Sequence, residues 1–237
     1  MIIEFPKIGE VRFEPSAKAK FIRILLKPFD GIQVTMPQRA DIRTAIAFVE
    51  LKTDWILQAK QRVAAQEKRR IIFTPEIDFS TKDRKLKLIS WKSERFSVRL
   101  SKDELKIFYP DEIEIQSDKA QEIIRKHIIN TLRKEAKEYL PLRTEQLAAE
   151  HGYIYKGVTV KNLKSRWGSC SATNRINLNI RLVRLPQHLS DYVILHELAH
   201  IVHKNHGSDF WQTLNKLTNG KVKQLTTEMK KYHADGF

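Results

Sequence analysis

The sequence contains one cysteine, Cys170, so no disulfide can form within the chain. No apolar run approaches the roughly 18 residues that a membrane-spanning helix needs. The first ten residues lack the basic flank and the long apolar core of a secretory signal. The cysteine pairs of zinc fingers and glycine-rich phosphate-binding loops are also missing. These absences predict a cytoplasmic protein that has no membrane partner and no dedicated nucleotide-binding loop.

Positive charge, in contrast, is abundant. The 237 residues include 43 Lys and Arg against 28 Asp and Glu, which gives a formal net charge of +15 with histidine neutral. Hydrophobic residues make up 41% of the chain, a proportion typical of a folded globular protein. A basic surface raises the local concentration of polyanions, so nucleic acid, nucleotides and acidic proteins are all candidate partners. A solvated basic surface that only keeps the protein soluble is the alternative. Charge alone does not choose among them.

The first half of the chain is predicted to be a β-rich region with one helix. The runs FIRILLKP and IQVTMP are typical of strands, and Asp30-Gly31 between them is a strong hairpin signal. Asp41 is the expected N-cap of the helix that follows. Short alternating runs over residues 71–118 predict an antiparallel meander. We therefore expect an N-terminal domain over residues 1–118.

A second domain is expected over residues 119–237. Its first helix is capped by Ser117 or Asp118, and Pro141 predicts a break or kink within it. After Gly152 the hydrophobic pattern alternates, which predicts two or three strands that end at Pro186. Strand-rich and helical stretches in one chain indicate an α+β fold.

The stretch DYVILHELAHIVH has the continuous apolar character of a buried helix, which we expect to begin at Ser190 or Asp191. On this helix His196 and His200 lie four residues apart, so their side chains differ by only about 40° in direction and roughly 6 Å in height. Two imidazoles so placed can share one metal ion. Glu197 sits beside that face, where its carboxylate can reach a metal-bound water without being a ligand.

A catalytic zinc ion needs a third protein ligand and an open position for water. If the helix continued, His203 would return to the same face, but it would stand about 10 Å along the axis from His196. His206 follows Asn205 and precedes Gly207, residues that tolerate the backbone reversal needed to bring it back. We therefore assign His206 as the third ligand and keep His203 as the alternative.

These histidines would also be compatible with a site that holds no metal, in which hydrogen bonds or solvent satisfy them. Glu197 and two histidines inside an apolar helix, however, carry a large desolvation cost unless something compensates it. A bound cation compensates all of them together, so we favour a metal site.

Three stretches in combination, KSRWGSCS, INLNIRLVRLP and YVILHELAHIVHKNHGSDFW, resemble the YgjP-like metallopeptidase family, a zincin group similar to the SprT-like proteases. The resemblance is close over about residues 155–215, and the earlier DGIQVTMP…WI also fits the family. It implies a zincin-like domain with a small twisted sheet and one Zn²⁺ ion bound by His196, His200 and His206. It also implies that Glu197 is the catalytic glutamate.

Several further residues are candidates for contacts with the substrate or the transition state. Gly168 and Ser169 would let a substrate backbone approach an edge strand. As a structural alternative, Gly168 marks a bulge and its neighbours Trp167 and Cys170 belong to the core. A developing oxyanion could be stabilised by polar side chains, for which the candidates are Arg166, Tyr192, Tyr232 and His233. His203 is a further candidate for a contact with the substrate or the transition state.

Three functions fit these patterns. The first is a zinc-dependent metallopeptidase, in which Glu197 acts as general base for a metal-activated water. The second is a metal-dependent phosphohydrolase of the pyrophosphatase type that acts on nucleoside triphosphates. The third is a basic nucleic-acid-binding module with a structural zinc. Glu197 argues against the third function, because a structural site favours a fourth protein ligand and needs no base.

Overall fold

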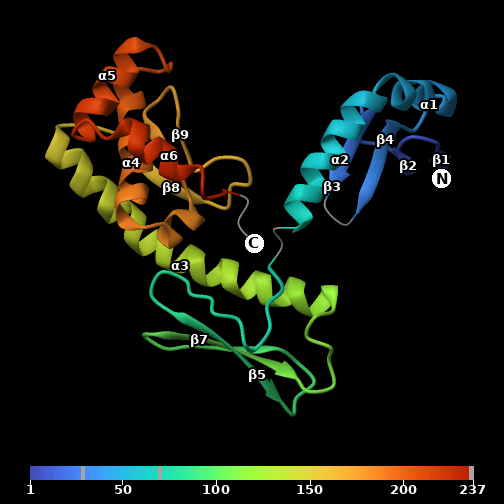
Figure 1. Ribbon diagram of the computed structural model, residues 1–237, viewed down its shortest axis with the longest axis horizontal. Coiled ribbons are helices and arrows are strands. Elements are labelled where there is room, and N and C mark those ends of the chain that lie inside the picture. The colour runs from blue at the N-terminus through green and yellow to red at the C-terminus, as the bar shows by residue number, and fades with distance from the viewer. Residues whose placement is uncertain (28–29, 69–70, 235–237) are drawn as a thin grey trace. The chain divides into compact units, whose positions relative to one another are not determined.

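The computed structural model describes residues 1–27, 30–68 and 71–234 and divides into two compact units, Met1–Ile71 and Ile72–Phe237 (Figure 1). Both units combine helices with strands, so the predicted α+β fold class is confirmed. None of the helices within the described ranges has a stretch that is both long and apolar enough to cross a bilayer.

The first unit is built on a four-stranded sheet. Its elements are β1 (Ile2–Phe5), β2 (Gly9–Ser16), β3 (Arg23–Lys27), β4 (Gly31–Pro37), α1 (Ile42–Leu51) and α2 (Thr53–Lys68). The sheet has the order β1-β2-β4-β3, in which β2 and β4 run parallel and the other pairs antiparallel. Alternate residues of β2 and β4 pack against the helices, and fully enclosed members of this core include Val11, Val34, Ala45, Val49 and Ile56.

The predicted hairpin is confirmed, because β3 and β4 pair antiparallel. Residues 28 and 29 of its turn lie outside the described ranges. The helix cap is confirmed as well: the Asp41 carboxylate accepts a hydrogen bond from the Arg43 backbone N–H at 3.0 Å. Two features differ from the prediction, since β1 and β2 come before the hairpin and the single helix is divided into α1 and α2. At the division, the Thr53 hydroxyl competes for the Val49 carbonyl, 3.4 Å away.

The second unit begins with a sheet of β5 (Lys85–Trp91), β6 (Ser97–Leu100) and β7 (Glu104–Pro110). Its order is β5-β7-β6, and β5 runs parallel to β7, so the predicted antiparallel meander is wrong for β5. Burial explains the order. The side chains of Leu105 and Ile107 on β7 are fully buried, whereas none of the four residues of β6 is buried. The more apolar strand takes the central position, where neighbours cover it on both sides.

Helix α3 (Asp118–His151) follows the sheet and is the longest element in Figure 1. The Ser117 hydroxyl caps it by accepting from the Ala120 backbone N–H at 3.4 Å. The helix continues through Pro141, so the predicted break does not occur. Proline costs one backbone hydrogen bond, but the helix buries side chains on both sides of it, including Leu140 and Leu147, and this packing offsets the loss.

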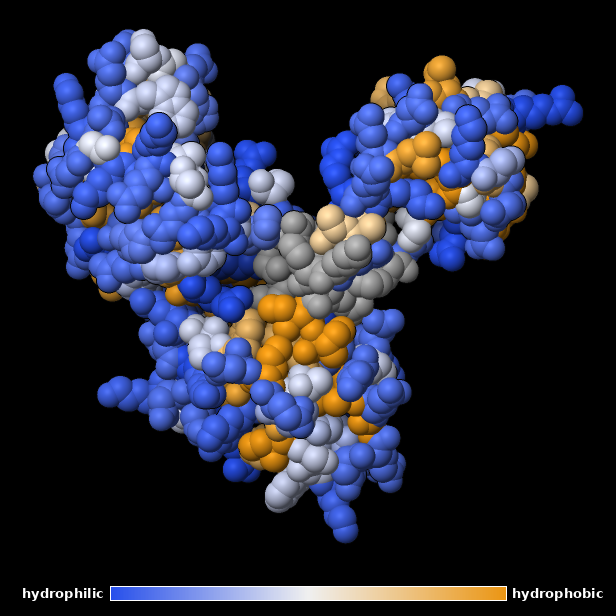
Figure 2. Space-filling model, in the orientation of Figure 1, coloured by the Kyte–Doolittle hydropathy of each residue, from blue (hydrophilic) through white to orange (hydrophobic). Residues whose placement is uncertain are grey.

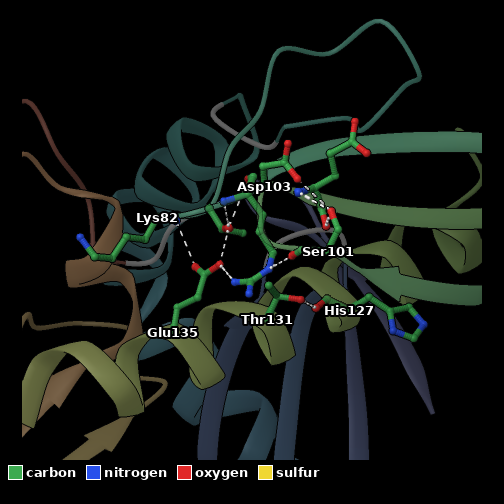
Figure 3. Close-up of polar contacts among 9 residues, drawn as sticks. Lys82, Ser101, Asp103, His127, Thr131 and Glu135 are labelled. Atoms are coloured by element: carbon green, nitrogen blue, oxygen red, sulfur yellow. Dashed lines mark hydrogen bonds and ion pairs between the residues drawn. The ribbon is translucent and has the colours of Figure 1, made fainter.

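Glu135 ties α3 to the segment that leads into β5 (Figure 3). Its side chain is 1% exposed and accepts hydrogen bonds from the Thr81 hydroxyl at 2.7 Å, the Lys82 backbone N–H at 3.0 Å and the Arg84 guanidinium at 2.7 Å. A buried carboxylate is tolerated when several donors satisfy it. Here the donors come from a segment more than 50 residues away in sequence.

The division between the compact units falls between residues 71 and 72, whereas the boundary predicted from the sequence lies at 118. Contacts with α3 account for the difference. Besides the Glu135 cluster, Gln121 on α3 donates to the Phe73 carbonyl at 2.8 Å and accepts from the Phe73 N–H at 2.9 Å. The pattern of apolar residues indicates where strands and helices lie in a sequence. It does not indicate which of them pack into the same core.

The remainder of the second unit comprises β8 (Gly157–Lys161), β9 (Gly168–Cys170), β10 (Arg175–Asn179), the 3₁₀ turn η1 (Ile180–Arg184), α4 (Gln187–Val202), α5 (Ser208–Leu217) and α6 (Val222–Met229). The three strands form a small sheet of order β8-β10-β9, with β10 parallel to β8 and antiparallel to β9. Strand β9 therefore lies at an edge, and α4 packs beside it.

Candidate metal centre

Helix α4 carries the HELAH sequence and is enclosed over most of its length, as its continuous apolar run predicts. It begins at Gln187, slightly before the predicted start, and ends at Val202. His203 then adopts an extended conformation, with φ −113° and ψ 101°. The chain reverses over the next few residues and enters α5, so that residues beyond the helix return to its histidine face.

His196, His200 and His206 come together at this reversal. The Nε2 atom of His206 lies 3.1 Å from that of His200 and 3.1 Å from that of His196. Nitrogen ligands in a tetrahedral zinc site with Zn–N bonds of about 2.0–2.1 Å stand about 3.4 Å apart. Among the residues that the structure describes, these three side chains form the group able to hold a metal ion. The donor set and its spacing fit such an ion.

Neighbouring groups fix the orientation of these rings. The His200 Nδ1 lies 2.9 Å from the His203 carbonyl, and because a carbonyl can only accept, Nδ1 carries the hydrogen and Nε2 presents its lone pair. The Phe210 ring stacks on His200, with centroids 4.5 Å apart. The Trp211 indole N–H donates to the His206 carbonyl at 3.1 Å. Sequence reasoning assigned no role to Phe210 or Trp211, although their place in the HGSDFW segment that begins at His206 was a usable signal.

Burial favours the neutral form of His196 and His200 on α4. It lowers the pKa of His196 to about 4, and the nearby His200 and His206 act in the same direction. Burial also lowers the pKa of His200. A neutral imidazole is the form that binds a metal, so His196 and His200 are ready to do so at neutral pH.

Glu197 points into the space between α4 and β9. Its side chain is 5% exposed, and Oε2 has no hydrogen-bond partner among the described residues. Burial raises its pKa to about 8, while the positive charge of Arg166 acts in the opposite direction. A buried carboxylate oxygen without a hydrogen-bond partner lowers the stability of the fold. Buried carboxylates with a strongly raised pKa are typical of functional sites.

Gly168 makes room for this carboxylate. A Cβ atom at Gly168 would lie 2.6 Å from Glu197 Oε1, 2.8 Å from Cγ and 2.9 Å from Cδ. Such distances are shorter than any van der Waals contact, so a larger residue would displace Glu197 or the strand. The glycine in RWGSC is thus required by a close approach to Glu197, a reason that the sequence does not disclose.

Substitution of Gly168 by alanine is expected to destabilise the protein by about 1 to 3 kcal/mol, because the added methyl group overpacks the site. In a Glu197→Ala background most of this cost should vanish, since the group that clashes has been removed. The coupling can be measured by a double-mutant cycle of thermal or urea unfolding. Equal costs in both backgrounds would show that the clash with Glu197 is not the cause.

Asn179 holds the segment that leads into Gly168. Its buried side-chain amide donates to the carbonyls of Leu163 at 2.8 Å, Arg166 at 2.9 Å and Ala234 at 3.4 Å, and its oxygen accepts from the Arg181 backbone N–H at 3.1 Å. One side chain therefore connects β10, the loop before β9 and the chain after α6. Sequence reasoning gave Asn179 no role, because its partners are distant in sequence.

The remaining predicted site residues lie outside the histidine group. Tyr192 is 8% exposed, and its hydroxyl lies 2.9 Å from the Thr226 hydroxyl, in the contact between α4 and α6. The His203 ring nitrogen Nε2 faces the Thr213 hydroxyl at 3.1 Å and does not join the histidine group. Ser169 accepts from the Asn177 amide at 3.2 Å. Arg166 is exposed before β9, and Tyr232 and His233 follow α6.

The family model described as YgjP-like, metallopeptidase domain, matches residues 20–232. Among solved structures, the metallopeptidase zymogen of Pyrococcus abyssi abylysin is 26% identical over 38% of this chain and 90% of that chain, with a TM-score of 0.34. The metallopeptidase zymogen of Methanocaldococcus jannaschii jannalysin is 23% identical over 38% and 91%, with a TM-score of 0.34.

No curated protein matches the sequence. The family model, however, spans most of the chain, and membership of a metallopeptidase family implies a bound metal. The chain therefore belongs to the YgjP-like family of metallopeptidase domains and is a hydrolase.

Proposed function

We propose that this protein is a zinc-dependent peptidase in which His196, His200 and His206 hold one Zn²⁺ ion and Glu197 is the general base. One observation carries the proposal. Three imidazole nitrogens converge next to a buried carboxylate whose Oε2 has no hydrogen-bond partner in the described chain. Three protein ligands leave a coordination position for water, which is the arrangement of a catalytic zinc site.

In the proposed peptide hydrolysis, the residues of the site have separate roles. When bound, the zinc ion supplies a Lewis acid that acidifies water and polarises the substrate carbonyl. Glu197 accepts a proton at Oε2 and passes it to the leaving amine. Burial raises the pKa of Glu197, and the positive charge of a loaded site lowers it again, so the carboxylate is ionised when it is needed. The His203 carbonyl keeps His200 in the required tautomer.

The proposed substrate is an extended polypeptide that adds to the edge of β9. This strand has β10 as its one neighbour in the described part of the sheet, so the backbone groups of its other edge are available for pairing. Gly168 offers no side chain that would obstruct the approach. Its two roles are compatible, because room for Glu197 is needed on one face of the sheet and pairing uses the edge.

A second candidate function is the hydrolysis of nucleoside triphosphates with release of pyrophosphate. The positive charges of Arg166 and Lys204, which lie near the two ends of β9, favour it. The lack of a glycine-rich phosphate cradle disfavours it. The nucleic-acid-binding module with a structural zinc stays a prediction. A structural zinc site has four protein ligands, whereas the three histidines supply three.

The test compares the zinc-loaded protein with its His206→Ala variant on an unstructured polypeptide and on a panel of nucleoside triphosphates. We expect the wild type to cleave polypeptide and to release neither phosphate nor pyrophosphate. The variant should bind zinc more than about 100-fold more weakly, because loss of a direct ligand exceeds the cost of losing an outer-shell partner. Zinc content after dialysis, measured by mass spectrometry, reports this directly.

His203→Ala is the matched control, because the His203 side chain contacts Thr213 instead of the histidine group. It should retain zinc. If His203→Ala loses zinc while His206→Ala keeps it, the third ligand is His203. Nucleotide hydrolysis without polypeptide cleavage would replace the first function by the second.

A further inference from the structure

Positive charge is concentrated in the part of the chain that builds the metal centre. Residues 152–237 contain 13 Lys and Arg but five Asp and Glu, an excess of eight within a total of +15. In the face shown in Figure 2, the surface over α4, α5, α6 and the neighbouring strands is mostly hydrophilic. A peptidase needs no such excess for catalysis, so the charge calls for a separate explanation.

Two of these cations flank strand β9. Lys204, in the loop after α4, places its Nζ 2.6 Å from the Asn174 side-chain oxygen and 3.4 Å from the Ser171 carbonyl, both in the turn that joins β9 to β10. Arg166 lies two residues before Gly168, at the other end of the strand. Both cationic side chains are exposed. The open edge of β9 therefore runs between two positive charges.

The carboxylates described between residues 152 and 234 do little to balance the charges of Arg166 and Lys204. Arg143 binds Asp191 through two hydrogen bonds of 2.7 and 2.8 Å. Glu228 lies 2.9 Å from a ring nitrogen of a histidine on α4. Glu197 is buried in the site. Of these described carboxylates, only Asp209 is exposed. It lies in the first turn of α5, where the positive end of the helix dipole partly offsets its negative charge.

We infer that the site selects acidic polypeptides, with Arg166 and Lys204 as the residues that determine this specificity. The inference rests on the proposed peptidase function. A chain paired along β9 advances about 3.3 Å per residue, so the three residues of this strand separate the two cations by a few substrate positions. Asp or Glu side chains a few residues to either side of the scissile bond would then each meet a positive charge.

The test uses peptides of equal length and identical scissile residues, in which the flanking positions are Glu, Gln or Lys. At low salt we expect the Glu peptide to be cleaved with a kcat/KM about three to ten times that of the Gln peptide, and the Lys peptide to be the poorest substrate. The preference should reside mainly in KM and should shrink at high salt, because exposed charges are screened.

Lys204→Gln and Arg166→Gln should each lower the ratio of Glu to Gln cleavage toward one. Lys137→Gln, which removes an exposed cation from α3, should leave the ratio unchanged. Equal cleavage of all three peptides, or a ratio unaffected by Lys204→Gln, would overturn the inference while leaving the peptidase function intact. If none of the peptides is cleaved and a nucleoside triphosphate is hydrolysed instead, both the proposed function and the polypeptide substrate are wrong.

Discussion

Replacement of Glu197 by glutamine is expected to lower kcat for polypeptide cleavage by about 10²- to 10⁴-fold, the range typical of a lost general base. Glutamine has nearly the size of glutamate, so it fits the narrow space that Gly168 leaves. It cannot accept a proton at neutral pH. The histidine group is untouched, and zinc content should therefore equal that of the wild type.

Steady-state kinetics and metal analysis of the same preparations provide the measurement. Asp209→Asn serves as the control, because it removes an exposed carboxylate that lies outside the histidine group. Cleavage by Glu197→Gln at more than about a tenth of the wild-type rate would exclude Glu197 as the base. Loss of zinc together with activity would instead assign Glu197 to the metal site itself.

The largest effect on stability is expected from Glu135→Ala. This change leaves the Thr81 hydroxyl, the Lys82 N–H and the Arg84 guanidinium without their shared acceptor. Removal of one member of a buried polar cluster typically costs 3 to 5 kcal/mol. Arg84 is partly exposed and can regain water, so we expect a loss of about 3 kcal/mol.

Hydrogen exchange provides a local measurement, because the cluster holds the segment that leads into β5. Backbone amides of β5 and β7 should exchange about 100-fold faster in Glu135→Ala. Glu138→Ala lies one helical turn further along α3 at an exposed position, and it should change neither exchange nor unfolding. Unchanged protection of β5 in Glu135→Ala would mean that the apolar contacts with α3 hold the sheet without this cluster.

Local signals predicted much of the fold. The caps at Asp41 and Ser117 are hydrogen bonds within a few residues, and the structure contains both. The hairpin at Gly31 depends on residues next to the turn. In contrast, the predictions of an antiparallel β5 and of a helix break at Pro141 were wrong. Both outcomes depend on burial against other segments, which outweighs local preference.

The same distinction applies to the candidate site. Helical spacing alone puts His196 and His200 on one face of α4, because the period of a helix is a local property. The choice of His206 as the third ligand depended on a predicted chain reversal after the helix. In the structure, His206 lies beside His196 and His200, in agreement with that prediction. The stacking of Phe210 on His200 could not be predicted in the same way, because it depends on how α5 packs against α4.

The sequence by itself determined that two histidines and a glutamate share one buried helix, and that the chain carries a large excess of positive charge. Only the tertiary structure decided that Gly168 packs against Glu197 and that Lys204 lies at the turn after β9. Neighbours along the chain obey the fixed geometry of the backbone, whatever surrounds them. Contacts between distant segments depend on how all the apolar faces pack together, and that packing is a property of the whole fold.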